Sequence, residues 1–206
     1  GFTNIGIDLI YALPGQTTAD FKKELEAAVF HAPHHLSCYM LTYEPGTPLF
    51  KDWKSGKCRP LDDETTASLY LDLVAFLSDH GYEPYEISNF ARRASAGEKD
   101  RRSRHNLKYW QGAPYLGFGP SAHSYKGNNR WWNHPDTQWY AADLSKNDLP
   151  VSGVESLTLE QLAMEAVYLG LRQTKGIDME AFNRPYGGVI GKAYGDAVDE
   201  MVDAGW

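Results

Sequence analysis

A histidine, an amide and two aromatic residues lie within six consecutive positions near the middle of the sequence. These residues are His105, Asn106, Tyr109 and Trp110. A neutral imidazole is a common axial ligand of haem iron, and aromatic rings can stack on a porphyrin plane. In either a helix or a strand, His105 and Tyr109 share one face. Taken alone, such a cluster is more typical of a structural histidine packed among aromatic residues.

A second candidate is Asp8, a carboxylate inside the apolar run at residues 4–13. A buried carboxylate needs a partner, which could be a structural hydrogen bond, a salt bridge or a ligand. Three segments follow the expected strands and should meet at the carboxyl edge of a parallel sheet, where ligands bind in α/β proteins. These segments are residues 13–17, 42–46 and 88–90. We therefore predict that Asp8, Thr42 and these segments face one cavity.

Residues 115–124 form a glycine-rich turn that ends in small polar residues and contains His123. Glycine lets the backbone approach a ligand closely. The spacing is not that of a dinucleotide fingerprint, and no buried strand precedes the turn. A tight structural turn and a ligand-contact loop both fit this segment.

The elements that must position these residues alternate between strand and helix in the first half of the chain. Apolar runs and helical stripes predict the order strand, helix, strand, helix, strand. The predicted ranges are 4–13, 18–31, 35–42, 63–80 and 84–90. This order indicates parallel crossovers and half of a (β/α) barrel, with the first strand buried on both faces.

The second half of the chain has a different pattern. A basic loop precedes His105, with seven Lys or Arg and two Asp or Glu between Arg92 and Lys108. We expect a hairpin at residues 121–133 around Gly127, then a short helix. Three further helices are expected toward the C-terminus, the first opened by a Thr158 capping box. The short helix spans residues 136–146, and the later ones span 158–172, a segment from 178, and 192–204.

Composition excludes several classes of function. A net charge of −7 opposes general nucleic-acid binding, which needs a basic face. No apolar run is long enough for a membrane span, and no signal peptide precedes the first strand. Two cysteines, Cys38 and Cys58, cannot alone bind an iron–sulfur cluster, and they favour a reduced, cytoplasmic protein. The start at Gly1 and the end at Trp206 suggest cuts through a longer parent.

Five segments together carry a resemblance to a known family. They are residues 1–17, 36–48, 86–91, 104–110 and 115–124. In order and spacing they resemble the oxygen-independent coproporphyrinogen III oxidase-like family of radical-SAM proteins, and the likeness extends over the whole chain. The His-Asn-x-x-Tyr-Trp motif beginning at His105 is similar to that of the haem-chaperone branch. True oxidases differ in this stretch.

The resemblance implies an α/β fold built from part of a radical-SAM barrel. On this basis we expect the second half of a (β/α)6 partial barrel, followed by a small α+β region with a truncated winged-helix-like end. The expected domains are residues 1–91, 92–151 and 152–206. The stretch 92–103 looks longer than the usual link between its flanking motifs, and nothing in the sequence explains it.

The family's sites carry over only in part. The resemblance implies S-adenosylmethionine (SAM) contacts at Asp8, at the main chain of Thr42 and at His123, where the oxidases have a different residue. It implies a haem site at His105, as iron ligand, with Asn106, Tyr109 and Trp110. The Cys-x3-Cys-x2-Cys motif that binds the family's [4Fe–4S] cluster is absent from the sequence.

The resemblance favours haem binding and delivery to a haem-accepting protein. The alternative is an enzyme, a SAM-dependent decarboxylase of coproporphyrinogen III. A winged-helix DNA-binding regulator is disfavoured by the acidic character of residues 152–206. Whether the parent is an active radical-SAM enzyme stays open, and we expect the chain on its own to lack that activity.

Overall fold

The computed structural model describes residues 2–187 and 189–205, with the side chains of 189–194 left out. It divides into two units, Gly1–Arg104 and His105–Trp206. This division does not coincide with the predicted boundaries after residues 91 and 151.

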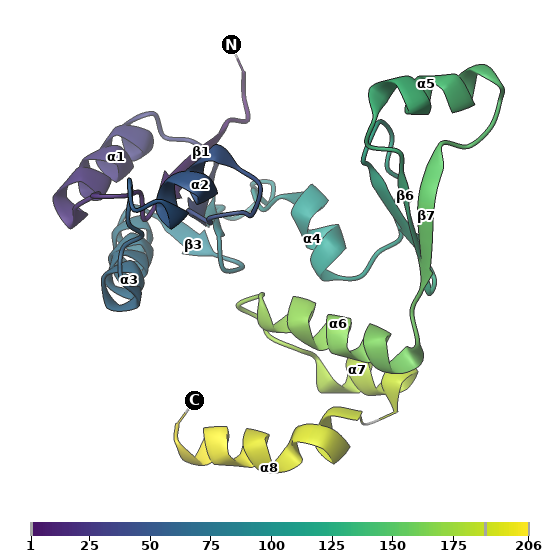
Figure 1. Cartoon of the computed structure of the whole chain (residues 1–206). Helices are drawn as coiled ribbons and strands as arrows, with labels where there is room; N and C mark the ends of the chain where they lie inside the picture. The colour runs from purple at the N-terminus through teal and green to yellow at the C-terminus, as the bar shows by residue number, and fades with distance from the viewer. Residues whose placement is uncertain (1, 188, 206) are drawn as a thin grey trace. The chain divides into compact units, whose positions relative to one another are not determined.

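The first unit contains a four-stranded sheet with the order β1-β2-β4-β3 (Figure 1). The strands are β1 (Gly6–Tyr11), β2 (His35–Met40), β3 (Tyr82–Pro84) and β4 (Asn89–Arg92). As predicted, β1 and β2 are parallel and connected through a helix, α1 (Thr18–Phe30).

The predicted third strand at residues 84–90 is wrong. Two short antiparallel strands, β3 and β4, replace it, and β4 runs antiparallel to β2. Pro84 ends β3, in keeping with the exclusion of proline from strand interiors. The turn between β3 and β4 lies beside β2, where the Cys38 amide donates to the Ser88 carbonyl oxygen at 2.7 Å.

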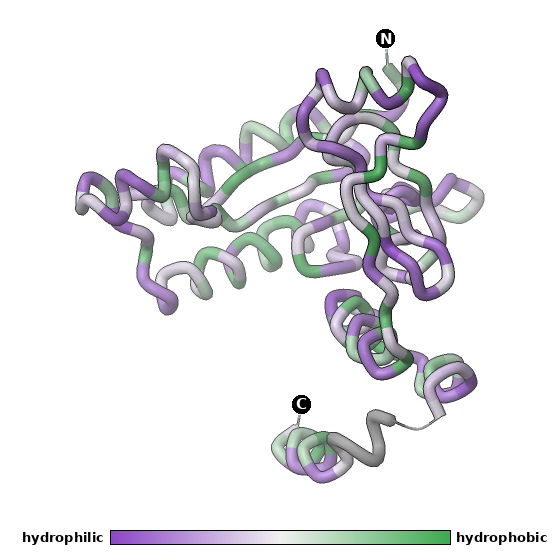
Figure 2. Tube along the Cα trace, turned by 45° about the vertical axis from the view of Figure 1, so that its right-hand side comes forward, coloured by the Kyte–Doolittle hydropathy of each residue, from purple (hydrophilic) through white to green (hydrophobic). Residues whose placement is uncertain are grey.

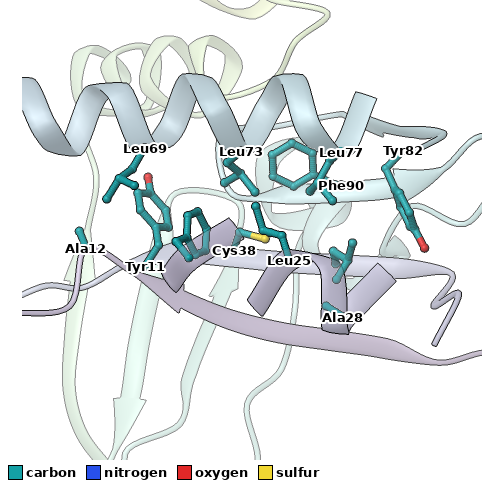
Figure 3. Close-up of a cluster of buried hydrophobic side chains, with 12 residues drawn as sticks. Tyr11, Ala12, Leu25, Ala28, Cys38, Leu69, Leu73, Leu77, Tyr82 and Phe90 are labelled. Carbon is teal, nitrogen blue, oxygen red and sulfur yellow. The ribbon is translucent and has the colours of Figure 1, made fainter. Parts of the chain in front are cut away.

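Two helices cover one face of this sheet. Both α1 and α3 (Asp63–Asp79) begin at side-chain caps, Thr17 and Asp62. Leu69, Leu73 and Leu77 of α3 point toward the sheet in Figure 3 and are almost fully buried. They pack with side chains of α1 and of all four strands. These are Phe21, Leu25, Ala28, Tyr11, Leu36, Cys38, Tyr82 and Phe90.

A further helix, α2 (Pro48–Lys54), was not predicted. It has Thr47 as its cap and a proline in its first turn, where the missing N–H costs nothing. Its seven residues hold too short a pattern for a periodicity argument.

The other face of the first sheet, the open face, is exposed along β1, whereas Ser37 of β2 and Asn89 of β4 on the same face are buried. Ile7, Leu9 and Tyr11 point to the helices, so Asp8 and Ile10 point away from them, and both are exposed. The expectation that the first strand is buried on both faces is therefore wrong for this chain.

The second unit holds a three-stranded antiparallel sheet with the order β5-β6-β7. The predicted hairpin is confirmed by β5 (His123–Lys126) and β6 (Asn129–Asn133). The third strand, β7 (Val151–Ser156), was not predicted and crosses the expected boundary after residue 151. Gly153 of β7 lies under the Trp132 ring, where any side chain would collide with the indole.

Five helices complete the described part of the second unit. They are α4 (Arg104–Trp110), α5 (Thr137–Ser145), α6 (Leu159–Leu171), α7 (Met179–Tyr186) and α8 (Val189–Asp203). The first residue of α4, Arg104, belongs to the first unit. The Thr158–Gln161 capping box of α6 is confirmed. One guanidinium nitrogen of Arg130 in β6, Nη2, donates to both carboxylate oxygens of Glu165 in α6, at 2.8 and 2.7 Å.

Hydrophobic and hydrophilic stretches alternate along the helices in Figure 2, as expected of amphipathic helices. Within the part of the chain that the structure describes, no helix is both long and apolar enough to cross a membrane.

Candidate functional site

The four residues of the His-Asn-x-x-Tyr-Trp motif lie on α4, a helix of seven residues. Helical spacing brings His105 and Tyr109 together, with ring centroids 4.9 Å apart in an edge-to-face arrangement. The His105 side chain is exposed, and Tyr109 is half-buried. An imidazole therefore stands at the surface beside an aromatic ring.

Tyr109 ties this helix to the second sheet. Its ring centroid lies 4.6 Å from that of Tyr115, which in turn lies 6.1 Å from Tyr125 of β5. The backbones of Tyr115 and Tyr125 exchange two hydrogen bonds of 2.9 Å. Burial raises the pKa of both phenols above the ordinary value of 10. Tyr109 thus connects His105 to the tyrosines at the edge of the second sheet.

Trp110 lies on a different side of α4. Its ring packs under the guanidinium of Arg172, 4.7 Å away, and its carbonyl oxygen accepts a bond of 3.4 Å from Gln173. Its buried indole N–H has no hydrogen-bond partner among the described residues. Asn106 is half-buried on the Trp110 side, four positions earlier. The structure thus brings His105 and Tyr109 together and turns Trp110 toward α6.

Asp8 belongs to a polar row across the open face of the first sheet. In register it is paired with Ser37 of β2, and Ser37 is paired with Asn89 of β4. Glu86 is buried, with 1% of its surface exposed, and it accepts hydrogen bonds from the Asn89 side chain and from the Ser88 amide. Thr42 is exposed and follows the carboxyl end of β2. The structure puts Asp8 away from the helices, as the shared-cavity prediction requires, but whether it shares a cavity with Thr42 stays a prediction.

His35 lies on the same open face. Its imidazole nitrogen Nε2 is 2.8 Å from the Tyr85 hydroxyl, which also accepts a bond from the Ser103 amide. Burial lowers the pKa of His35, and the nearby carboxylates of Asp8 and Glu86 oppose that effect. Burial likewise raises the pKa of Tyr85 to about 12. The contact of His35 with Tyr85, fifty positions later, leaves no signal in the local sequence.

His123 belongs to the second unit, whereas Asp8 and Thr42 belong to the first. It is exposed on β5, and its ring stacks on that of Trp132 with centroids 5.7 Å apart. In the preceding turn, a methyl group on Gly117 would collide with the His123 carbonyl oxygen. The amide of Asn133 donates to the Gly119 carbonyl oxygen at 2.9 Å. These contacts account for the glycine-rich turn as a tight structural element.

The cysteines of this chain do not fit an iron–sulfur cluster. Cys38 is buried in the first core, and burial raises the pKa of its thiol to about 12. Cys58 is partly exposed and unpaired. Across residues 2–187 and 189–205 no group of three or more potential metal ligands gathers. A cluster of four irons needs more thiolates than these two residues supply.

Comparisons with known proteins support the sequence resemblance. No protein-family model matches the chain. It is 40% identical over 181 residues to the heme chaperone HemW of Mycobacterium tuberculosis, covering 87% of the chain and 44% of that protein. It is 32% identical over 205 residues to the heme chaperone HemW of Bacillus subtilis, covering 100% of the chain and 52% of that protein. The chain thus spans about half the length of the curated relatives it matches.

The solved structure of the coproporphyrinogen III oxidase HemN from Escherichia coli, a radical-SAM enzyme, superposes with a TM-score of 0.72. It is 19% identical, and the match covers 100% of this chain and 48% of that one. The fold is therefore of the HemN radical-SAM type. The sequence identities to the two HemW proteins then indicate the branch within this family: the chain belongs to the HemW-like branch.

Proposed function

We propose that this chain carries the haem-binding helix of a haem-delivery protein, with His105 as the iron ligand. The observation that carries the proposal is the exposed imidazole of His105, set edge-on to Tyr109 at 4.9 Å on a helix supported by Tyr115. Relatives named as heme chaperones support it. The oxidase alternative has less support, because the oxidase match is 19% identical.

An exposed histidine beside aromatic surface suits haem chemically. When bound, the iron would take an imidazole nitrogen, and the porphyrin would lie against apolar ring surface. We assign Tyr109 to shaping that surface. Asn106 and Trp110 would act from the side of α4 that packs toward α6, as supports of the helix.

The remaining expectations belong to a longer protein. We propose that the first unit forms part of a (β/α)6 barrel whose interior is the open face carrying Asp8. Asp8, Thr42 and His123 would then contact SAM. The ligands of a [4Fe–4S] cluster would have to lie outside these 206 residues. The winged-helix-like end, the three-part domain division and a haem-accepting partner are likewise proposals.

A haem titration followed at the Soret band tests the proposal. The wild-type chain should bind one equivalent of haem in a saturable way. His105→Ala should weaken binding by about tenfold or more, since losing even a supporting partner at a metal site costs about 10–100-fold. His31→Ala is the matched control, because His31 is also exposed at a helix end, with its ring centroid 5.5 Å from that of Phe30. Equal affinities for the two variants would refute the role of His105.

A further inference from the structure

A row of two cations runs along α4 beside the His105–Tyr109 pair. Arg104 and Lys108 are four residues apart on the helix and therefore lie on one side, next to the row of His105 and Tyr109. The Lys108 ammonium lies 5.3 Å from the centre of the Tyr109 ring. Its charge is thus held on the side where the imidazole is exposed.

These two cations have no carboxylate partner within the described part of the chain. The neighbouring Arg102 does have such a partner, because its guanidinium donates hydrogen bonds of 2.7 to 3.0 Å to the Asp100 carboxylate. The other acidic residue of the loop, Glu98, accepts a bond of 2.8 Å from the Ser95 amide. Both carboxylates of this basic stretch are therefore engaged elsewhere.

The rest of α4 limits where a ligand could approach. The Trp110 side packs against Arg172 and Gln173 of the same unit. An exposed imidazole, an aromatic ring and two unmatched positive charges remain together on the other side. That combination suits a flat ligand that carries both a metal and negative charge at its edge.

We propose that Arg104 and Lys108 bind the carboxylate side chains of an iron porphyrin whose metal is held by His105. This inference rests on the proposed function and extends it from the metal to the edge of the ligand. It also gives a role to two cations of the motif segment 104–110, which follows the basic stretch. The residues would favour porphyrins with free carboxylates over neutral ones.

The test compares iron protoporphyrin IX with its dimethyl ester, in which methylation removes both carboxylate charges, and titrates both ligands in the same detergent. The double variant Arg104→Gln/Lys108→Gln should weaken binding of the free acid about tenfold, at about threefold for each exposed charge pair. Binding of the dimethyl ester should change less than about twofold. Raising the salt concentration should reduce the difference between the two ligands.

Arg102→Gln is the matched control, since it removes the same charge from an arginine already paired with Asp100. It should leave both affinities within about twofold. Circular dichroism checks that each variant folds. Equal weakening of both ligands by the double variant, or weakening of neither, would overturn the proposal. Failure of the proposed function is distinguishable, because His105→Ala would then leave the Soret spectrum unchanged with both porphyrins.

Discussion

At the scale of single residues, the two cysteines differ in surroundings. Cys38 is 1% exposed, with its thiol pKa raised to about 12, while Cys58 is partly exposed. Because the thiolate is the reactive form, we expect an aromatic disulfide reagent to modify one thiol per native chain. In denaturant it should modify two. Rapid modification of both cysteines before unfolding would contradict the burial of Cys38, and peptide mass spectrometry identifies the modified residue.

Gly117 is required by contact with neighbouring backbone. A methyl group there would meet the His123 carbonyl oxygen and lie 2.9 Å from the Ala122 side chain. We predict that Gly117→Ala destabilises the second unit by about 1–3 kcal/mol, the usual cost of overpacking. Gly6→Ala is the control, since its nearest neighbour would be 3.7 Å away. Thermal unfolding of both variants measures the difference, and equal midpoints would show that the turn can relax.

At the scale of elements, local signals in the sequence located most helices. The capping box at Thr158 predicted the start of α6, because a cap satisfies N–H groups within one turn of the chain. The break between β3 and β4 was missed. Its cause is not local: the direction of β4 depends on pairing with β2, some fifty residues earlier. The apolar residues of 84–90 fit a single strand equally well.

The stripe of α3 should carry much of the stability of the first unit. Leu73 is 0% exposed in the core, whereas Leu71 on the same helix is 67% exposed. Leu73→Ala should lower the free energy of unfolding by about 2–5 kcal/mol through lost burial and a cavity. Leu71→Ala should change it by less than about 0.5 kcal/mol. Urea unfolding followed by circular dichroism measures the free energy of unfolding of both variants. Similar decreases for Leu73→Ala and Leu71→Ala would contradict the burial of Leu73 in the core.

At the scale of the whole molecule, the open sheet face of the first unit should respond to pH. Burial lowers the folded-state pKa of His35 below the ordinary histidine value of 6.5. The unfolded chain then binds a proton more readily than the folded one, so stability falls as the pH drops through 6.5 toward the lower folded value. Above that range the histidine is neutral in both states and contributes no pH dependence.

His35→Gln should therefore flatten the decline in unfolding free energy between pH 7.5 and 5.5, while His31→Gln should follow the wild type. Because Gln also loses the contact with Tyr85, the slope with pH is the measure, and the absolute stability is not. An unchanged slope would mean that His35 is protonated as easily in the folded unit as in the unfolded chain.

The candidate sites were predictable to different degrees. The motif at His105 stands in one short segment, so its residue types were visible in sequence, and the helical spacing then brought His105 and Tyr109 together. The role of Trp110 was not visible, because its partner Arg172 lies sixty-two positions later. Asp8 was expected to be buried and therefore to need a partner, yet it is exposed on the open face. Burial depends on the whole assembly of elements, which one strand's pattern cannot reveal.

The central claim is that His105 on α4 holds the iron of haem. Electron–nuclear double resonance of the ferric haem complex, prepared with 15N-histidine-labelled protein, tests it most directly. We predict an imidazole nitrogen coupling in the wild type and in His31→Ala, and loss of that coupling in His105→Ala with the helix content unchanged. An unaltered coupling in His105→Ala would contradict the account and assign the iron to another ligand.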